Sequence, residues 1–302
     1  MDTRMVSAIA GLAGALAWAL CPAAHASVQV VDDSGATVTL KAPAARIVSL
    51  APHATELLFA AGAGDRIVGA VEFSDFPEAA KRIPRVGSSA QLDMERIVGL
   101  APDLVVVWLN GSSAARLDKV RALGVPIFYS EPRTLADIPA TLRRFGTLAA
   151  TESPARAAAD GFARQAAALR ATYAQSSPVT VFWQIWARPL LTINGRHLIS
   201  DVISLCGGAN VFEGLGPLVP AVSIEAVVAA DPEAIVTTSN DATAGRDDGL
   251  DAWHKLRNLR ATSRRNLIVL NAETIHRQSP RILEGVAALC EALESVRARR
   301  TR

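Results

Sequence analysis

The sequence predicts an α/β protein with two βα lobes, mainly parallel sheets, and one long rigid helix that joins the lobes. Three observations support this fold class. Short apolar, β-rich runs alternate with stretches of helical spacing, the alternation restarts after an alanine-rich segment, and similar segments recur in the same order in both halves. A chain of 302 residues also exceeds the usual size of one compact core, so two units are expected.

The first 26 residues have the pattern of a secretion signal. Arg4 supplies positive charge, Ala8–Leu20 is an apolar run, and Ala24-His25-Ala26 has the small-x-small form of a cleavage site. The apolar run is too short to span a bilayer with margin. We therefore expect export and cleavage near Ala26, and we divide the chain into four parts: 1–26 signal peptide, 27–150 N-terminal lobe, 151–177 interlobe helix and 178–302 C-terminal lobe.

The N-terminal lobe is expected to contain a buried strand at Arg46–Leu50 and a helix at Thr55–Ala61. Thr55 has the side chain of an N-cap, and Gly62 follows the last helical residue. The remaining elements of this lobe follow the same alternation. They are strands at Ile67–Val71, Leu104–Trp108 and Pro126–Tyr129, and helices at Met94–Leu100 and Ala114–Leu123.

The segment Pro154–Tyr173 is rich in Ala and has no β-branched residue before Thr172, so its helix propensity is high. Phe162, Leu169 and Tyr173 recur at helical spacing, which favours one long helix over a disordered linker. The strand and helix pattern then restarts. We expect strands at Val179–Trp183, Ala234–Thr238 and Leu267–Leu270, and helices at Ser200–Leu205 and Ile282–Arg297.

A weak internal repeat connects the two halves. Met94–Val106 resembles Ile224–Val236, because in both a short helix stops before a Pro and an acidic residue leads into a strand. Glu56–Gly62 similarly resembles Asp201–Gly207. Two matches in the same order indicate duplicated lobes.

Composition and motifs exclude several classes of function. The net charge of +2 and the lack of a Lys/Arg block interleaved with aromatic residues exclude a nucleic-acid-binding surface. The sequence has no G-x-S-x-G elbow, H-E-x-x-H motif, Walker loop or dinucleotide fingerprint, so no catalytic residue is predicted. Its histidines show no spacing typical of a metal site. An enzyme or a sensor on the same fold remains a remote alternative.

Two cysteines, Cys206 and Cys290, remain after the predicted cleavage. An even pair in an oxidising compartment favours a disulfide over a metal site, which would need further ligands. Cys290 shares the inward stripe of the terminal helix with Val286, Leu289 and Leu293. A pair of buried free thiols is the alternative.

Several motifs resemble the family of siderophore, haem and cobalamin receptors of ABC importers. The motifs are RIVSLAPHATELLFAAGAGDRIVG, FSDFP and LDMERIVGLAPDLVVVW in the first half, and ISLCGGANVFEG, VSIEAVVAADPEAIV and HRQSPRILEGVAALCEAL in the second. The similarity extends from Arg46 to Leu293, and the cysteine pair indicates the cobalamin branch. The resemblance implies a periplasmic monomer without stable membrane insertion. Such a protein captures cobalamin or a related corrinoid between its lobes and delivers it to a dimeric membrane permease.

Three aromatic residues match ligand contacts of this family. Trp108 ends a predicted strand, and its wide, rigid indole suits a macrocycle, whereas a core Trp that caps the sheet is the alternative. Phe73 follows the strand Ile67–Val71, and Trp186 follows the first strand of the second lobe. Because Trp183 lies close to Trp186 in sequence, we expect one of them in the core and the other in the cleft.

The resemblance also assigns polar ligand contacts to Arg277 and Glu273, whereas a surface salt bridge between the two is the alternative. The family places a Trp near Ser89 and another near Val219, and this chain has neither. Haem or a ferric siderophore is therefore kept as the alternative ligand. His53, His276 and Tyr129 are candidate axial ligands of a haem iron, with both histidines expected in loops after strands.

Glu95 and Glu225 occupy equivalent positions in the repeat. They match the two carboxylates that engage basic residues of the permease in this family, and two such groups on separate lobes suit a pseudo-twofold pair of subunits. Each also opens a short helix, where an interaction with the helix dipole is the alternative role.

Overall fold

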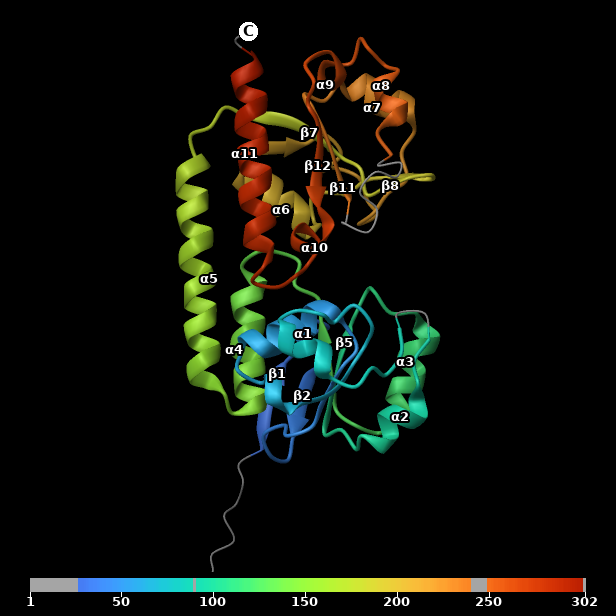
Figure 1. The fold of residues 1–302 in the computed structure, drawn as a ribbon, viewed down its shortest axis with the longest axis vertical. Helices are drawn as coiled ribbons and strands as arrows, with labels where there is room; N and C mark the ends of the chain where they lie inside the picture. Colours follow the sequence, from blue (N-terminus) through green and yellow to red (C-terminus); the bar gives the residue numbers. More distant parts are fainter. Residues whose placement is uncertain (1–26, 89–90, 240–248, 301–302) are drawn as a thin grey trace, which may run out of the picture.

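The computed structural model describes residues 27–88, 91–239 and 249–300, which form two α/β lobes beside one long helix (Figure 1). The predicted fold class is confirmed. The predicted signal peptide, residues 1–26, lies outside the described residues. Within the described ranges, no helix is both long enough and apolar enough to cross a membrane.

The N-terminal lobe is built on a parallel four-stranded sheet with the strand order β4-β3-β5-β6. The first four residues of β5 are buried, as expected of an apolar strand covered on both faces. A hairpin of β1 and β2 precedes the sheet. The elements are β1 (Val28–Val31), β2 (Thr37–Leu40), β3 (Ile47–Ser49), α1 (Pro52–Ala60), β4 (Ile67–Ala70), α2 (Met94–Gly99), β5 (Leu104–Trp108), α3 (Ala114–Arg121), β6 (Ile127–Ser130) and α4 (Asp137–Ala149), with short 3-10 helices at Gly64–Arg66 and Glu78–Arg82.

The C-terminal lobe repeats this design. Its parallel sheet has the order β10-β7-β11-β12, in which the second strand along the chain again lies at the edge beside the first. The shared strand order supports the duplication inferred from the sequence. The elements are β7 (Val179–Trp183), β8 (Trp186–Ala187), β9 (Leu190–Leu191), α6 (Leu198–Leu205), β10 (Gly208–Asn210), α7 (Ile224–Ala230), β11 (Ala234–Ser239), α8 (Asp251–His254), α9 (Arg260–Ser263), β12 (Leu267–Asn271), α10 (Ala272–Ile275) and α11 (Ile282–Arg300).

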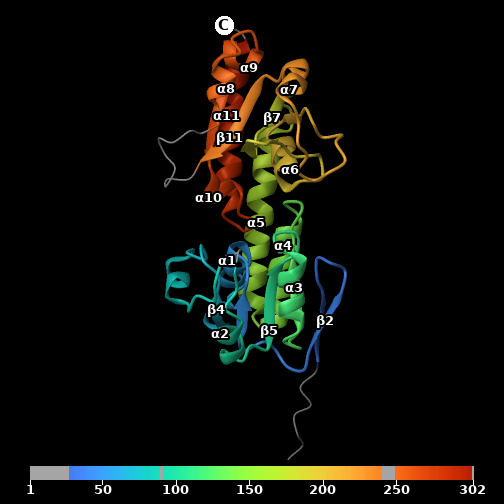
Figure 2. The ribbon, with the colours of Figure 1, turned by 90° about the vertical axis from the view of Figure 1, so that its right-hand side faces the viewer.

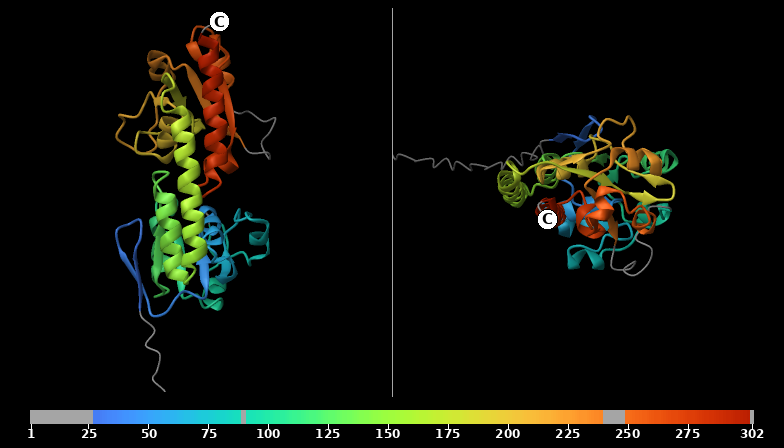
Figure 3. Two further views of the ribbon diagram at one scale, coloured as in Figure 1. Left: turned by 90° about the vertical axis from the view of Figure 1, so that its left-hand side faces the viewer. Right: turned by 90° about the horizontal axis from the view of Figure 1, so that it is seen from above.

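The long helix α5 (Glu152–Tyr173) runs along both lobes and packs beside α4 and α11 (Figures 1 and 3). Its buried face consists of three alanines and Phe162, which join the apolar core of both lobes. Small side chains let α4 approach closely, since a Cβ added at Gly146 of α4 would lie 2.4 Å from the Cβ of Ala155. The helix is therefore a packed spine and not a free linker.

Two differences from the sequence-based expectations concern helices of the N-terminal lobe. Helix α1 begins at Pro52, so Thr55 is not its N-cap; Thr55 is buried inside the helix, and its hydroxyl donates to Ser49 Oγ at 2.8 Å. Helix α4 had no predicted counterpart, because Pro139 and Gly146 interrupt its pattern. Pro139 lies in the first helical turn, where a proline is tolerated, and the apolar face of α4 packs on the core.

The disulfide Cys206–Cys290 is formed in the structure, and its Cα atoms lie 4.7 Å apart. Cys206 is the C-cap of α6, and Cys290 lies in the buried stripe of α11. The bond thus attaches the terminal helix to the second lobe, as predicted.

Candidate ligand-binding cleft

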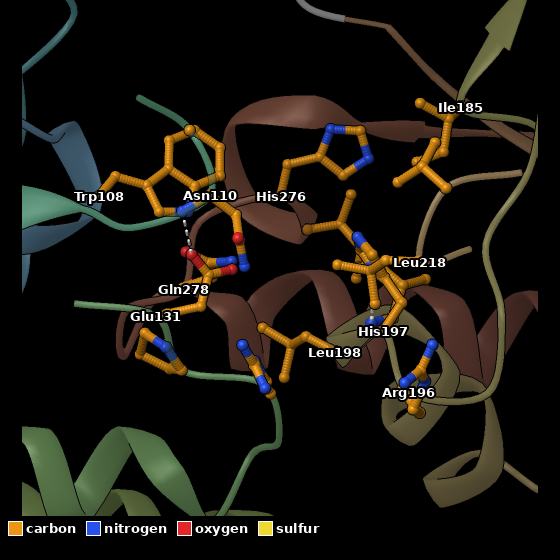
Figure 4. A pocket seen from close by; sticks show the side chains of 16 residues that line it. Trp108, Asn110, Glu131, Ile185, Arg196, His197, Leu198, Leu218, His276 and Gln278 are labelled. Carbon is orange, nitrogen blue, oxygen red and sulfur yellow. Dashed lines mark hydrogen bonds between the residues drawn. The ribbon is translucent and has the colours of Figure 1, made fainter. Parts of the chain in front are cut away.

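A cavity of about 300 Å³ lies between the lobes, and segments that follow the carboxyl ends of strands line it. Open α/β sheets bind ligands at this end, because the loops there are free to vary while the sheet holds them in place. The N-terminal lobe supplies the loops after β5 and β6, and the C-terminal lobe supplies the segments after β7, β9, β10 and β12. Figure 4 shows the side chains that line the cavity, among them Trp108, Asn110, Glu131, Ile185, Arg196, His197, Leu198, Leu218, His276 and Gln278.

Trp108 forms part of the cavity wall, because it is the last residue of β5 and projects beyond the buried part of the strand. Its side chain is 37% exposed and packs edge-on against His53, with ring centroids 5.6 Å apart. The indole N–H donates to the Glu131 carboxylate (Figure 4). These two contacts fix the orientation of the indole face before any ligand arrives.

Glu131 is a buried carboxyl group beneath this wall, 6% exposed. It also accepts a hydrogen bond from the backbone N–H of Asn110 at 3.0 Å. Burial raises the pKa of Glu131, whereas the hydrogen bonds from Asn110 and Trp108 oppose that shift. Glu131 was not among the predicted site residues, although its position directly after β6 places it at the same sheet edge as Trp108.

Two histidines form the opposite wall. His197 is the N-cap of α6, and its Nδ1 accepts from the backbone N–H of Ile199 at 3.1 Å, so the neutral ring carries its proton on Nε2. Burial lowers the pKa of His197 to about 4, with nearby His276 adding to the effect. Enclosure by the cleft walls, helped by Arg277, lowers the pKa of His276 to about 4, although the residue is exposed where it lines the cavity. Both imidazoles are therefore neutral at pH 7.

The structure separates the three candidate axial ligands. His53 is buried inside α1 and not in a loop, and its Nε2 lies 3.1 Å from Ser130 Oγ. The Tyr129 hydroxyl accepts a hydrogen bond from Arg121 Nε at 3.1 Å. The Tyr129 side chain packs against a separate apolar cluster of the N-terminal lobe. Only His276 of the three lines the cavity, where His197, which the sequence did not single out, joins it.

Arg277 and Glu273 form an ion pair, with Arg277 Nη2 2.5 Å from Glu273 Oε2. The salt bridge between these two residues, which was the alternative to a role in ligand contact, is thus present. The Arg277 side chain is 17% exposed, and its Nε also lies 3.9 Å from Glu56 of the other lobe. Neither residue lines the cavity that contains Trp108; Glu273 instead lines a second hollow between the lobes, together with Phe73.

Phe73 and Trp186 are exposed aromatic residues outside the cavity wall, 68% and 62% exposed respectively. Trp183, in contrast, is fully buried in the core, so the two nearby tryptophans divide into one core and one surface residue. Val219 lines the cavity at the point where the family resemblance places a Trp. Ser89 lies outside the described residues.

Glu95 and Glu225 lie at the second position of the short helices α2 and α7, and both are exposed. The helices are capped alike, because Asp93 and Ser223 accept the N–H groups of Arg96 and Ala226. A hydrogen bond from its own backbone N–H, together with Ser223, lowers the pKa of Glu225. The carboxylates therefore occupy equivalent exposed positions on the two lobes.

Known proteins share this architecture. Residues 47–274 match the family model described as periplasmic binding protein, which covers most of the chain. This chain belongs to the periplasmic binding protein family. Its membership agrees with the two-lobed fold and with the position of the cleft.

Individual relatives of this periplasmic binding protein include a vitamin B12-binding protein of Vibrio parahaemolyticus. That protein is 37% identical over 259 residues, which cover 85% of this chain and 92% of the relative. The crystal structure of the periplasmic vitamin B12-binding protein BtuF of Vibrio cholerae superposes with a TM-score of 0.75 at 34% identity, covering 84% of this chain and 98% of BtuF. The periplasmic haem-binding protein RhuT of Roseiflexus sp. RS-1 has a TM-score of 0.71 at 25% identity, covering 83% and 98%.

Proposed function

We propose that this chain is the extracytoplasmic substrate-binding protein of an ABC importer and that it captures cobalamin or a related corrinoid. The observation that carries the proposal is the interlobe cavity with its oriented Trp108 face. A flat aromatic wall opposite neutral hydrogen-bonding groups suits a macrocycle with amide side chains. The identity of about one third to relatives named as vitamin B12-binding proteins supports the same ligand.

A cavity of about 300 Å³ lies at the lower end of the range for ligand pockets, so a corrinoid would extend out of it. The exposed aromatic rings of Phe73 and Trp186, and the Glu273–Arg277 pair, then remain available for the parts of the ligand outside the cavity. We propose binding without catalysis, in the periplasm, after cleavage near Ala26. The lobes are proposed to extend over 27–150 and 178–302, on either side of an interlobe segment at 151–177.

Titration calorimetry of the mature protein with cyanocobalamin, cobinamide and haemin tests the proposal. We expect one corrinoid per monomer and a dissociation constant below about 1 μM, equivalent to about 8 kcal/mol of binding free energy. Failure of all three compounds to bind in this range would contradict the ligand assignment. Tight binding of haemin alone would replace the corrinoid by haem.

Haem or another metal chelate with an open axial position is the second candidate, because His276 faces the cavity and is neutral at pH 7. A neutral imidazole is a good axial ligand. The visible absorption spectrum distinguishes the candidates, since corrinoids and haem absorb differently. If the imidazole ligates the iron, His276→Ala should change the spectrum of the haem complex.

We propose that Glu95 and Glu225 dock the protein onto a dimeric membrane permease. Val98 and Val228 support this role, because they are exposed one helical turn beyond each carboxylate, 59% and 44% respectively. Each lobe thus presents a similar pair of one acidic and one apolar side chain. Such a surface suits a partner with basic residues around an apolar contact.

The variants Glu95→Ala and Glu225→Ala should keep the ligand affinity of the parent but associate more weakly with the permease. The association of the parent protein should also weaken as salt rises, because exposed charges are screened. Pull-down of the permease in detergent across a salt series measures both effects, with Glu291→Ala on α11 as the exposed control. Normal association of the double variant would remove the docking role.

A further inference from the structure

Two acidic residues reach across the lobe interface. Glu56 of α1, in the N-terminal lobe, accepts a hydrogen bond from Ser279 Oγ at 2.5 Å. The same carboxylate accepts two hydrogen bonds from Arg281, from Nη2 at 2.6 Å and from Nε at 3.1 Å. Ser279 and Arg281 belong to the segment between α10 and α11 in the C-terminal lobe, which lies opposite α1 in Figures 1 and 2.

The second acidic residue reaches in the opposite direction. Asp201 of α6, in the C-terminal lobe, accepts the backbone N–H of Leu135 at 2.8 Å. Leu135 belongs to the segment between β6 and α4 of the N-terminal lobe, and it is buried. Arg170 of the long helix α5 approaches the other carboxylate oxygen of Asp201 at 3.7 Å. Asp201 thus contacts both the opposite lobe and the spine.

These contacts are related by the internal repeat. Glu56 and Asp201 begin the matching segments Glu56–Gly62 and Asp201–Gly207, and both lie in the helix that follows the first strand of a lobe sheet. Each contacts the segment that precedes the last helix of the other lobe. We call the two contacts the interlobe clasps: Glu56 with Ser279 and Arg281, and Asp201 with Leu135.

The clasped segments also line the ligand cavity. Glu131, Pro132 and Arg133 precede Leu135, and His276 and Gln278 precede Ser279. Each lobe therefore holds the binding loop of its partner in place. We propose that Glu56 and Asp201 are positioning residues for ligand binding, which fix the two binding loops and set the separation of the lobes; their role in binding rests on the function proposed above.

Burial makes the Glu56 clasp sensitive to substitution. The Glu56 side chain is 4% exposed and the Arg281 side chain 18% exposed. The Arg281 guanidinium also lies over the ring of Phe76 in the N-terminal lobe, with Cζ 4.2 Å from the ring centroid. Removing one member of a buried, hydrogen-bonded pair leaves the other without its partner, which costs more than the pair contributes. The Asp201 clasp instead needs only an acceptor for a neutral N–H, so an amide oxygen can replace the carboxylate there.

The test measures the distance between the lobes without any ligand. Spin labels are attached at Lys119→Cys on α3 and Lys255→Cys beside α8, and their distance distribution is recorded by pulsed electron resonance. We expect a broader distribution in Glu56→Leu and in Asp201→Leu, but a parental one in Asp201→Asn and in the exposed control Glu291→Ala. If Glu56→Leu fails to fold, Ser279→Ala/Arg281→Met removes the same three hydrogen bonds from the side of the other lobe.

Cyanocobalamin titration of the same variants tests the link to binding, with an expected loss of affinity of at least about tenfold in both leucine variants. A parental distance distribution in the clasp variants overturns the proposal, whatever their affinity. Broadened distances with parental affinity overturn the positioning of the binding loops. If the parent protein itself binds no corrinoid, the proposed function fails, whereas the distance measurement still decides whether the clasps hold the lobes.

Discussion

Removal of the disulfide in the variant Cys206→Ala/Cys290→Ala should lower the free energy of unfolding, and loss of the crosslink itself should account for up to about 4.5 kcal/mol of the change. The bond joins residues 84 positions apart, and it limits the conformational entropy of the unfolded chain. The chain-entropy relation for a loop of that length gives this value as an upper limit. Both cysteines are fully buried, so the smaller alanine side chains add a loss of core packing. Urea unfolding of the mature protein, followed by circular dichroism, measures the change.

Reduced parent protein is the matched control, because it lacks the bond but keeps both sulfur atoms in the core. The difference between it and the double variant isolates the packing contribution. Thiol counting on denatured, unreduced protein should find no free thiol in the described part of the chain. Two free thiols from Cys206 and Cys290, or equal stability of oxidised and reduced protein, would contradict a stabilising bond.

Truncation of the indole in Trp108→Ala should weaken corrinoid binding by about 1–3 kcal/mol, or roughly 5- to 150-fold. Trp108 is 37% exposed and lines the cavity, so removal of its side chain deletes ligand-contact surface more than core. Calorimetric titration gives the affinity, and thermal unfolding of the unliganded variant checks the fold.

The variant Trp108→Phe keeps an aromatic face but loses the hydrogen bond to Glu131, so its affinity should lie between those of the parent and of Trp108→Ala. Glu131→Gln, which keeps an acceptor for the indole N–H, should bind nearly as the parent does. A destabilised Trp108→Ala protein with parental affinity would show that Trp108 acts as a core residue and not as a ligand contact.

The sequence alone predicted the fold class, because strands and helices have local signals and the same order of signals recurs in both halves. Apolar runs at strand spacing predicted β5 and β7, the alanine-rich segment predicted α5, and the paired cysteines in an exported chain predicted the disulfide. It did not predict α4, whose Pro139 and Gly146 resemble helix breakers until the tertiary contacts are known. Gly146 is needed because α5 lies so close that a Cβ at this position would clash with Ala155. Helical periodicity contains no information about this close approach of two helices.

The candidate site was likewise predicted in part from the sequence and decided in part by the tertiary structure. The family resemblance and its place at a strand end singled out Trp108, and the structure places it in the cavity wall, since the carboxyl edge of a parallel sheet can be located from the order of strands and helices. Only the tertiary structure showed that His276 faces the cavity whereas His53 is buried, because a histidine near a strand end has no sequence signal for its direction. The interlobe clasps were equally hidden: the repeat made Glu56 and Asp201 equivalent, but their partners Ser279, Arg281 and Leu135 lie far away along the chain. Hydrogen bonds between segments so distant in sequence depend on how the lobes pack, and that packing exists only in the folded molecule.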